Sequence, residues 1–214
     1  MELTITLSGD LPARCAQALA ALAPELSLRM AEGGVPVRGQ RGDRLAVCFD
    51  SETVAVTWAQ PVQFYRALSL LPRPLSPCRI EEKPCFETVG IMFDCSRNAV
   101  LLPETLRSIL RKMALMGLNL GMMYTEDTYE VPGQPYFGYQ RGRYTFAELQ
   151  ALDDYADMLG IELCPCVQTL GHLNRALHWP AMQHLQDNDE VLLADDEQTY
   201  EFLRQILAAA SAPY

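Results

Sequence analysis

The feature that most constrains the fold is an alternation of apolar runs and amphipathic stretches after residue 88. Three apolar runs are typical of buried strands, and they cover residues 89–94, 118–124 and 161–168. Each is followed by a stretch with helical periodicity, and these stretches cover residues 103–117, 145–160 and 196–210. Because parallel strands need a crossover connection, usually a helix, the alternation predicts three βα units with a parallel sheet.

Individual residues refine the expected ends of these elements. Gly117 and Gly160 follow the first two helical stretches, and glycine commonly ends a helix because it readily adopts a left-handed conformation. Thr145 and Glu148 have the spacing of a capping box at the start of the second helix. Pro165 lies inside the third apolar run and indicates a bulge or an unusual strand end.

The connections between these elements differ greatly in length. Both helix-to-strand connections are a single glycine, whereas two strand-to-helix connections cover residues 125–144 and 169–195. Loops of that length inside a compact domain are usually functional, and a (β/α)8 barrel builds its active site from the strand-to-helix loops. We therefore predict an α/β fold in which residues 88–214 form the first three βα units of a TIM-type (β/α)8 barrel, incomplete in this chain.

The sequence of residues 1–72 indicates a small α+β domain that precedes the barrel units in the chain. Alternating apolar residues indicate strands at 3–7, 44–49 and 53–58, the last two joined as a hairpin. Two helices are predicted, each opened by a proline, at residues 11–23 and 61–71. Because prolines 72, 74, 77 and 84 disfavour any regular element, we predict that residues 73–87 are a linker.

The net charge of −10 limits the kinds of partner that the chain can bind. An excess of acidic side chains argues against nucleic acid and anionic membrane surfaces as partners. No apolar run approaches the roughly 20 residues of a membrane helix. The first residues do not resemble a secretory signal, and seven cysteines form an odd set, so we expect reduced thiols and a cytoplasmic location. The oligomeric state is not predicted.

Polar and aromatic side chains gather at the predicted strand ends. The polar ones are, in chain order, Asp94, Arg97, Glu126, Asp127, Gln168 and His172. The aromatic ones are Tyr124, Tyr129, Tyr136, Phe137, Tyr139 and Trp179. Guanidinium and carboxylate groups form hydrogen bonds with hydroxyl groups, and aromatic faces stack on sugar rings. This set predicts a carbohydrate pocket.

One further pair of side chains, Cys164 and Cys166, could belong to a metal site, but apolar packing explains the pair better. Cys164 and Cys166 would share one face of a strand, and His172 could complete a site with them. Zinc sites usually space their cysteines more widely and need a third and a fourth ligand. We therefore favour apolar packing for this pair and predict no metal and no organic cofactor.

Three segments resemble glycoside hydrolase family 20, the β-N-acetylhexosaminidases. FDCSRNAVL (93–101) looks like the family's Asp-x-x-Arg segment after barrel strand one. LNLGMMYTEDTYE (118–130) is similar to its Thr-Asp-Asp segment after strand two, with Glu126 where most members have aspartate. YTFAELQALDDYADMLGIELCPCVQTLGH (144–172) resembles the strand-three segment that ends in Gly-His. The resemblance covers roughly residues 54–200 and implies an α+β domain followed by a barrel.

The resemblance also implies roles for the polar residues. Arg97 would donate hydrogen bonds to the C3 and C4 hydroxyls of a terminal N-acetylhexosamine. Glu126 and His172 would form a hydrogen-bonded pair that supports the general acid. In this family the acetamido oxygen of the sugar attacks the anomeric carbon, one aspartate orients the amide, and the adjacent glutamate protonates the leaving oxygen. Further substrate contacts are expected from Asp94, Asp127, Tyr129 and Trp179.

The aspartate and glutamate of that mechanism follow barrel strand four, in a segment of the type His-x-Gly-x-Asp-Glu. No such segment occurs in the 214 residues. We therefore predict the N-terminal part of an enzyme that hydrolyses amino-sugar glycosides or oligosaccharides ending in β-linked N-acetylglucosamine or N-acetylgalactosamine, and we expect this chain alone to be inactive. The alternatives are a catalytically inactive carbohydrate-binding relative and a different barrel glycosidase with Glu126 as its general acid.

Overall fold

The computed structural model describes residues 2–97 and 99–214, which form two compact units. The first unit contains the chain up to Gly90 together with Arg107–Leu120 and Tyr155–Glu162. The second contains Ile91–Leu106, Gly121–Asp154 and Leu163–Tyr214.

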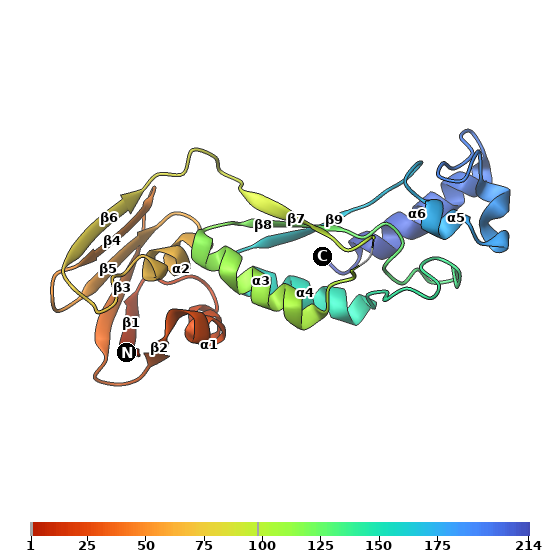
Figure 1. Ribbon diagram of the computed structural model, residues 1–214. Coiled ribbons are helices and arrows are strands. Elements are labelled where there is room, and N and C mark those ends of the chain that lie inside the picture. The colour runs from red at the N-terminus through yellow and green to blue at the C-terminus, as the bar shows by residue number, and fades with distance from the viewer. Residues whose placement is uncertain (1, 98) are drawn as a thin grey trace. The chain divides into compact units, whose positions relative to one another are not determined.

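The first unit is built on a six-stranded mixed sheet (Figure 1). In spatial order its strands are β2 (Leu28–Met30), β1 (Leu3–Gly9), β3 (Val35–Arg41), β5 (Val54–Trp58), β4 (Leu45–Phe49) and β6 (Cys78–Glu82). Strands β2, β1, β3 and β5 run parallel, and β4 is antiparallel to both β5 and β6. The hairpin of β4 and β5 lies where the sequence predicts it.

Two helices contribute to the core of this unit, namely α1 (Cys15–Leu26) and α2 (Pro61–Ser69). Fully buried apolar side chains from these helices and from the strands include Leu19, Leu22, Val37, Val56, Phe64 and Leu68. Helix α2 is opened by Pro61, as predicted, with the Gln60 and Gln63 side chains capping its first turn. Helix α1 starts three residues after Pro12, because Arg14 adopts a left-handed conformation with φ of 56°.

The segment predicted to be a linker is only partly irregular. Residues Cys78–Glu82 form β6, which pairs with β4 at the edge of the six-stranded sheet. The prolines of this segment flank those five residues and none lies within them, so every backbone amide of β6 can donate. A segment rich in proline can thus contain a strand, provided that the prolines lie outside it.

The remaining strands form a second sheet with the order β7 (Gly90–Asp94), β8 (Leu120–Tyr124) and β9 (Glu162–Cys166). At one end the Asn119 amide donates to the Val89 carbonyl at 2.9 Å, and at the other the Cys95 amide donates to the Tyr124 carbonyl at 2.8 Å. The strands therefore run in the same direction, as the βα alternation predicts. These three strands do not close a barrel.

Helices follow the strands of the second sheet in the predicted order. Helix α3 (Pro103–Met116) connects β7 to β8, and α4 (Phe146–Met158) connects β8 to β9. After β9 come a one-turn helix α5 (Asn174–Leu177), a 3-10 helix η1 (Pro180–Leu185) and α6 (Glu197–Ser211). The two shorter helices lie inside the segment predicted to be a long loop.

The predicted helix ends of the second sheet's crossovers are confirmed. The Thr145 amide donates to the Glu148 carboxylate at 2.9 Å, and the Glu148 amide donates to the Thr145 hydroxyl at 3.2 Å, which is a complete capping box. Gly117 and Gly160 follow α3 and α4 with φ of 80° and 74°. Pro165 lies in β9, which is an edge strand where a missing amide donor is tolerated.

Strand β7 is more exposed than predicted. Phe93 is buried, but Ile91 is 37% exposed and Met92 is 53% exposed. Strand β7 is an edge strand of the three-stranded sheet. The apolar run forms the predicted strand, but its side chains are only partly buried.

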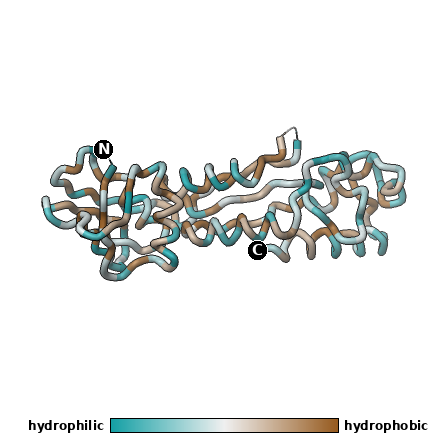
Figure 2. Tube along the Cα trace, turned by 90° about the horizontal axis from the view of Figure 1, so that it is seen from below, coloured by the Kyte–Doolittle hydropathy of each residue, from teal (hydrophilic) through white to brown (hydrophobic). Residues whose placement is uncertain are grey.

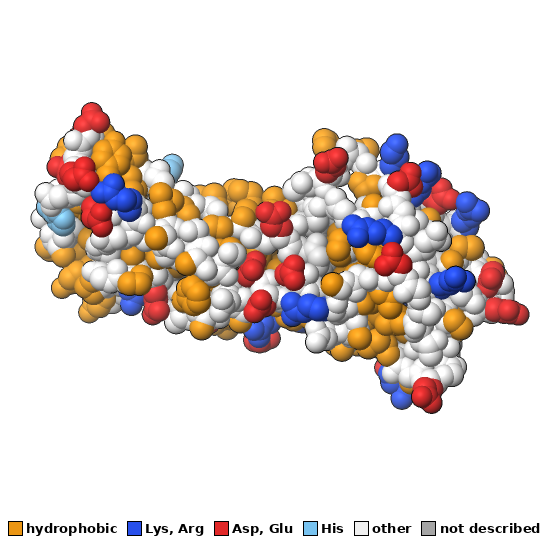
Figure 3. Space-filling view, turned by 180° about the vertical axis from the view of Figure 1, so that it is seen from behind, with side chains coloured by type: hydrophobic (Ala, Val, Ile, Leu, Met, Phe, Trp, Pro, Cys, Tyr) orange, Lys and Arg blue, Asp and Glu red, His pale blue; other side chains and the backbone are white. Residues whose placement is uncertain are grey.

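Hydrophobic residues concentrate along the strands and on single sides of the helices (Figure 2). No helix among the described residues combines the length and the apolar character needed to cross a membrane. Figure 3 shows acidic and basic side chains interspersed with hydrophobic ones on the face that it draws.

Candidate functional site

A cavity of about 400 Å³ lies where β7, β8 and β9 end. Its walls are formed by Ser96, Arg97, Glu126, His172, Asn174, Arg175 and Glu190. The three residues on which the carbohydrate prediction depends, Arg97, Glu126 and His172, therefore face one cavity although each follows a different strand. The parallel direction of the strands causes this, because their carboxyl ends meet at one edge of the sheet.

Asp94 holds Arg97 at the wall of the cavity. One carboxylate oxygen of Asp94 accepts hydrogen bonds from the amide and the hydroxyl of Ser96, at 3.0 and 2.6 Å. The other accepts a hydrogen bond from Arg97 Nη1 at 2.7 Å. The Ser96 hydroxyl above all, and then the Ser96 amide and Arg97, hold the pKa of Asp94 below its ordinary value. The carboxylate is therefore ionised, and the three hydrogen bonds that it accepts orient Ser96 and Arg97.

The Arg97 guanidinium remains accessible in spite of that contact. Its side chain is 61% exposed and lies over the Tyr124 ring, with 5.7 Å between the guanidinium carbon and the ring centre. The hydrogen bond from Arg97 to Asp94 raises the pKa of the guanidinium further. A planar cation that is anchored by Asp94 and Ser96 and is still more than half exposed can donate to neighbouring hydroxyls of a ligand.

Glu126 enters the cavity from a strained backbone position. Its φ of 49° lies in the left-handed region, which is uncommon for a residue with a side chain. The Glu126 amide donates to the side-chain carbonyl of Gln168 at 3.2 Å, and the Glu126 carboxylate accepts from the Tyr124 hydroxyl at 3.3 Å. Gln168 follows β9, so a residue from the third strand end stabilises the turn after the second.

His172 also has a left-handed backbone, with φ of 60°, and its side chain is exposed. Across the part of the chain that the structure describes, no hydrogen bond joins His172 to Glu126, although both line the cavity. The predicted hydrogen bond between Glu126 and His172 is therefore not formed in this structure, and one oxygen of the Glu126 carboxylate accepts from the Tyr124 hydroxyl instead.

Asp127 lies away from the cavity and is 1% exposed. Its carboxylate lies 2.9 Å from Arg141 Nη1, without the alignment of a hydrogen bond. Burial raises the pKa of Asp127, and the charge of Arg141 opposes that rise. Arg141 Nη2 in turn donates to the carbonyl of Arg97 at 3.2 Å. The pair thus supports the backbone of Arg97, and Asp127 has no exposed oxygen for a ligand.

Tyr129 and Trp179 have different surroundings from each other. Tyr129 is 2% exposed and its hydroxyl donates to the Ile206 carbonyl at 3.2 Å, so it is part of the core. Trp179 does not line the cavity. It contacts Tyr136 and Tyr139, with 6.1 and 5.1 Å between ring centres, and the His178 ring at 4.2 Å.

Sequence reasoning missed several groups at this site. Asn174 and Arg175 lie on α5, Glu190 lies in the segment after η1, and Arg141 reaches the site only through Arg97. The sequence of these segments has no periodicity that would place them near β7. Ser96 was detectable, because it lies between Asp94 and Arg97 in a segment that the sequence already marks.

No group of three or more His, Cys, Asp or Glu side chains with the geometry of a metal site occurs in residues 2–97 and 99–214. All seven cysteines have free thiols.

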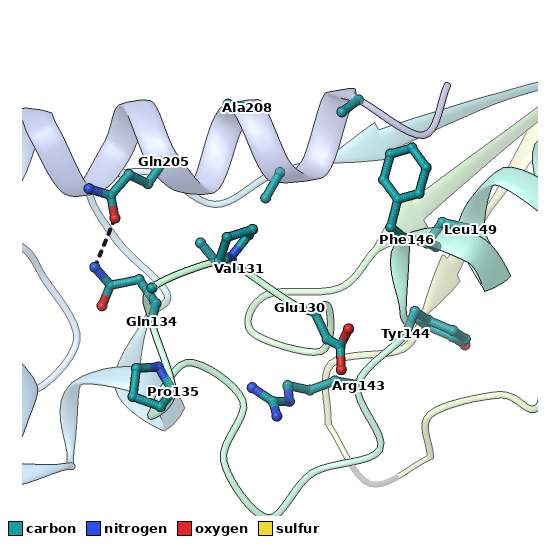
Figure 4. A pocket seen from close by; sticks show the side chains of 14 residues that line it. Glu130, Val131, Gln134, Pro135, Arg143, Tyr144, Phe146, Leu149, Gln205 and Ala208 are labelled. Atoms are coloured by element: carbon teal, nitrogen blue, oxygen red, sulfur yellow. Dashed lines mark hydrogen bonds between the residues drawn. The ribbon is translucent and has the colours of Figure 1, made fainter.

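A different cavity, of about 780 Å³, lies next to α4 and α6 (Figure 4). Figure 4 shows Gln205 and Ala208 of α6 on one side and Val131 and Gln134 on the other, with the Gln134 amide donating to Gln205 at 2.9 Å. Apolar side chains dominate its lining. None of the candidate residues Arg97, Glu126 and His172 faces it.

One curated protein and several solved structures are similar to this chain. No family model matches the chain. Beta-hexosaminidase 3 of Arabidopsis thaliana is 26% identical over 166 residues, which cover 71% of this chain and 30% of that protein. The chain thus spans less than a third of this curated relative.

Solved structures with the same fold include two family 20 enzymes. An exo β-N-acetylglucosaminidase from Vibrio harveyi has a TM-score of 0.78 at 18% identity and is matched over all of this chain and 42% of its own. The β-N-acetylhexosaminidase of Streptomyces coelicolor has a TM-score of 0.77 at 19% identity, over 97% of this chain and 53% of its own. The chain has the fold of part of the family 20 enzymes, which confirms the resemblance.

Proposed function

We propose that the chain is part of a β-N-acetylhexosaminidase that removes terminal β-linked N-acetylglucosamine or N-acetylgalactosamine. The observation that carries this proposal is the convergence of Arg97, Glu126 and His172 on one cavity from three separate strand ends. The likeness to family 20 structures supports the same reading, because one of them was solved with N-acetylglucosamine bound.

In this proposal Arg97 binds the hydroxyls of the terminal sugar. A guanidinium offers five N–H donors in one plane, and the contact with Asp94 uses only part of them. Asp94 is then a positioning residue, since its carboxylate already accepts three hydrogen bonds within the chain.

Glu126 and His172 are assigned a supporting role at the sugar. The strained backbone of Glu126 and its hydrogen bond from Tyr124 keep a carboxylate at the cavity wall, where it can accept from a ligand or from His172. The nucleophile is the acetamido oxygen of the substrate itself. No His-x-Gly-x-Asp-Glu segment occurs in the 214 residues, so we assign to this cavity substrate binding and support, and not a complete catalytic site.

Calorimetry with N-acetylglucosamine tests the proposal on the chain itself. Replacing Arg97 by alanine removes charged hydrogen bonds worth about 1.5–3 kcal/mol, which weakens binding about tenfold or more. Arg204→Ala is a matched control, because the side chains of Arg97 and Arg204 are 61% and 60% exposed and both pair with carboxylates. Equal affinities for all three proteins would refute the role of Arg97.

A second candidate is a catalytically inactive relative that binds amino sugars, which the exposed Arg97 guanidinium at the cavity wall also fits. A chromogenic N-acetyl-β-glucosaminide separates a complete site from a partial one. We expect no turnover by the 214-residue chain. Turnover that disappears in Arg97→Ala would show that the cavity is a complete catalytic site, contrary to both candidates.

A further inference from the structure

We propose that Glu190 is a specificity-determining residue of the cavity at the carboxyl ends of β7, β8 and β9, and that its carboxylate accepts a hydrogen bond from a hydroxyl group of the bound amino sugar. The inference rests on the proposed function, because it takes the ligand to be the sugar that Arg97 binds. Glu190 lies outside the three sequence motifs, which end at residue 172, and the proposed function gives it no role.

Glu190 faces the cavity with a side chain that is available to a ligand. It lines the cavity together with Arg97, Glu126 and His172. The residue is exposed, so a ligand in the cavity can reach its carboxylate. In the part of the chain that the structure describes, this carboxylate takes part in no hydrogen bond and no ion pair. Its hydrogen-bonding capacity is therefore not used within the chain.

The backbone of Glu190 is fixed next to that of His172. The Glu190 carbonyl accepts a hydrogen bond from the amide of Leu173, the residue that follows His172, at 3.1 Å. Two residues after Glu190, the Leu192 amide donates to the Leu170 carbonyl at 2.9 Å. Leu173 and Leu192 are each 1% exposed. Glu190 thus reaches the cavity from a segment that is tied at two points to the segment of His172.

The Glu190 carboxylate supplies the kind of hydrogen bond that the arginines at the cavity cannot supply. A guanidinium only donates, whereas a sugar hydroxyl both donates and accepts. Of the two carboxylates at the wall, that of Glu126 already accepts from the Tyr124 hydroxyl. Both oxygens of Glu190 remain as acceptors. Glu190 is therefore the carboxylate best suited to accept from a sugar hydroxyl.

The charges at the wall fit a neutral sugar. The guanidinium groups of Arg97 and Arg175 and the carboxylates of Glu126 and Glu190 line the cavity. Among residues 2–97 and 99–214 no ion pair joins Arg175 to Glu190, so direct contact does not neutralise the Glu190 carboxylate. An acidic sugar would meet a like charge there, which disfavours its binding. A hydroxyl group of a neutral sugar can donate to the same carboxylate.

Calorimetry of the 214-residue chain with N-acetylglucosamine tests the role of Glu190. Glu190→Ala removes a charged acceptor and should weaken binding about tenfold. Glu190→Gln keeps a carbonyl acceptor without the charge and should lose less. Asp189→Ala is the matched control, because Asp189 is the adjacent acidic residue, is exposed and does not line the cavity. Its affinity should equal that of the native chain.

Analogues of N-acetylglucosamine that lack the C3, C4 or C6 hydroxyl distinguish a hydrogen bond to the sugar from a structural effect. The native chain should bind one of them about tenfold more weakly than the parent sugar because of Glu190. In Glu190→Ala that difference should disappear. A purely structural role would instead weaken the binding of all the sugars alike and keep every difference between them.

The outcomes separate this inference from the proposed function. Native affinity in Glu190→Ala overturns the role of Glu190, as does equal weakening in Asp189→Ala, or a set of differences between the analogues that is the same in the native chain and in Glu190→Ala. If Arg97→Ala still weakens binding in any of these cases, the proposed function stands. Failure of the native chain to bind N-acetylglucosamine overturns both.

Discussion

The two sheets of this molecule differ in how deeply their apolar side chains are buried. In the six-stranded sheet Val37, Val47 and Val56 are at most 1% exposed, whereas Met92 in the three-stranded sheet is 53% exposed. Parallel sheets are usually covered on both faces. The difference teaches that the first sheet contributes mainly a core, while the second contributes a row of strand ends that brings polar side chains together.

The largest expected difference between the two sheets is in stability. Phe64 is fully buried in the first unit, so Phe64→Ala should lower the free energy of unfolding by about 3–5 kcal/mol. Met92→Ala on the open sheet removes a largely exposed side chain and should cost at most about 1 kcal/mol. Urea denaturation followed by circular dichroism measures both. Equal losses would contradict the assignment of the main core to the first unit.

The next effect concerns the buried pair under the site. Asp127→Asn removes the counter-charge that lies 2.9 Å from Arg141 Nη1, so the Arg141 guanidinium loses the group that holds it in place. Because Arg141 also donates to the Arg97 carbonyl, affinity for N-acetylglucosamine should fall in the same variant.

The pH dependence of this pair has a defined sign. Burial raises the pKa of Asp127, so the folded state binds its proton more tightly than the unfolded state. Its contribution to stability is therefore largest below the ordinary value of 3.8 and decreases as the pH rises through the raised pKa. Asp127→Asn should abolish this decrease. An unchanged pH profile in the variant would show that Asp127 is not its source.

A smaller effect is expected at the helix that leads into β9. Thr145→Ala removes one half of a reciprocal capping box and should cost about 1 kcal/mol. Thr145→Ser keeps the hydroxyl and should retain most of the stability. If serine and alanine destabilise equally, the hydroxyl cap is not the cause.

The smallest effect is at the anchor of Arg97. Hydrogen bonds from Ser96 and Arg97 lower the pKa of Asp94, so the anchor is present above the ordinary value of 3.8 and is lost as the pH falls through the lowered pKa. Sugar affinity should accordingly hold between neutral pH and about pH 4, and Asp94→Asn should weaken it at all pH values. Affinity that is insensitive to this replacement would contradict the positioning role.

The same contrast explains how much could be read from the sequence. The βα units and their caps are local signals, since Thr145, Glu148, Gly117 and Gly160 act within one turn of the chain. Strand β3 was missed because its residues include Pro36, Gly39 and charged side chains, and it is held by pairing with β1 and β5, which are distant in sequence. Such pairing leaves no local pattern.

Some residues of the site could likewise be predicted from the sequence, and others could not. The sequence predicted that Arg97, Glu126 and His172 lie close together, because parallel strands end at a common edge of the sheet. The burial of Asp127 and the positions of Arg175 and Glu190 at the cavity depend on how two long segments pack. No periodicity in the sequence specifies this packing.

The most direct test of the central claim is an NMR titration of the chain with N-acetylglucosamine. The side-chain signals of Arg97 Nε–H and His172 Cε1–H should shift together and report one dissociation constant, while His184, which is exposed and does not line the cavity, should not move. A sugar that shifts only one of the two, or that shifts His184 equally, would contradict the convergence of three strand ends on one amino sugar.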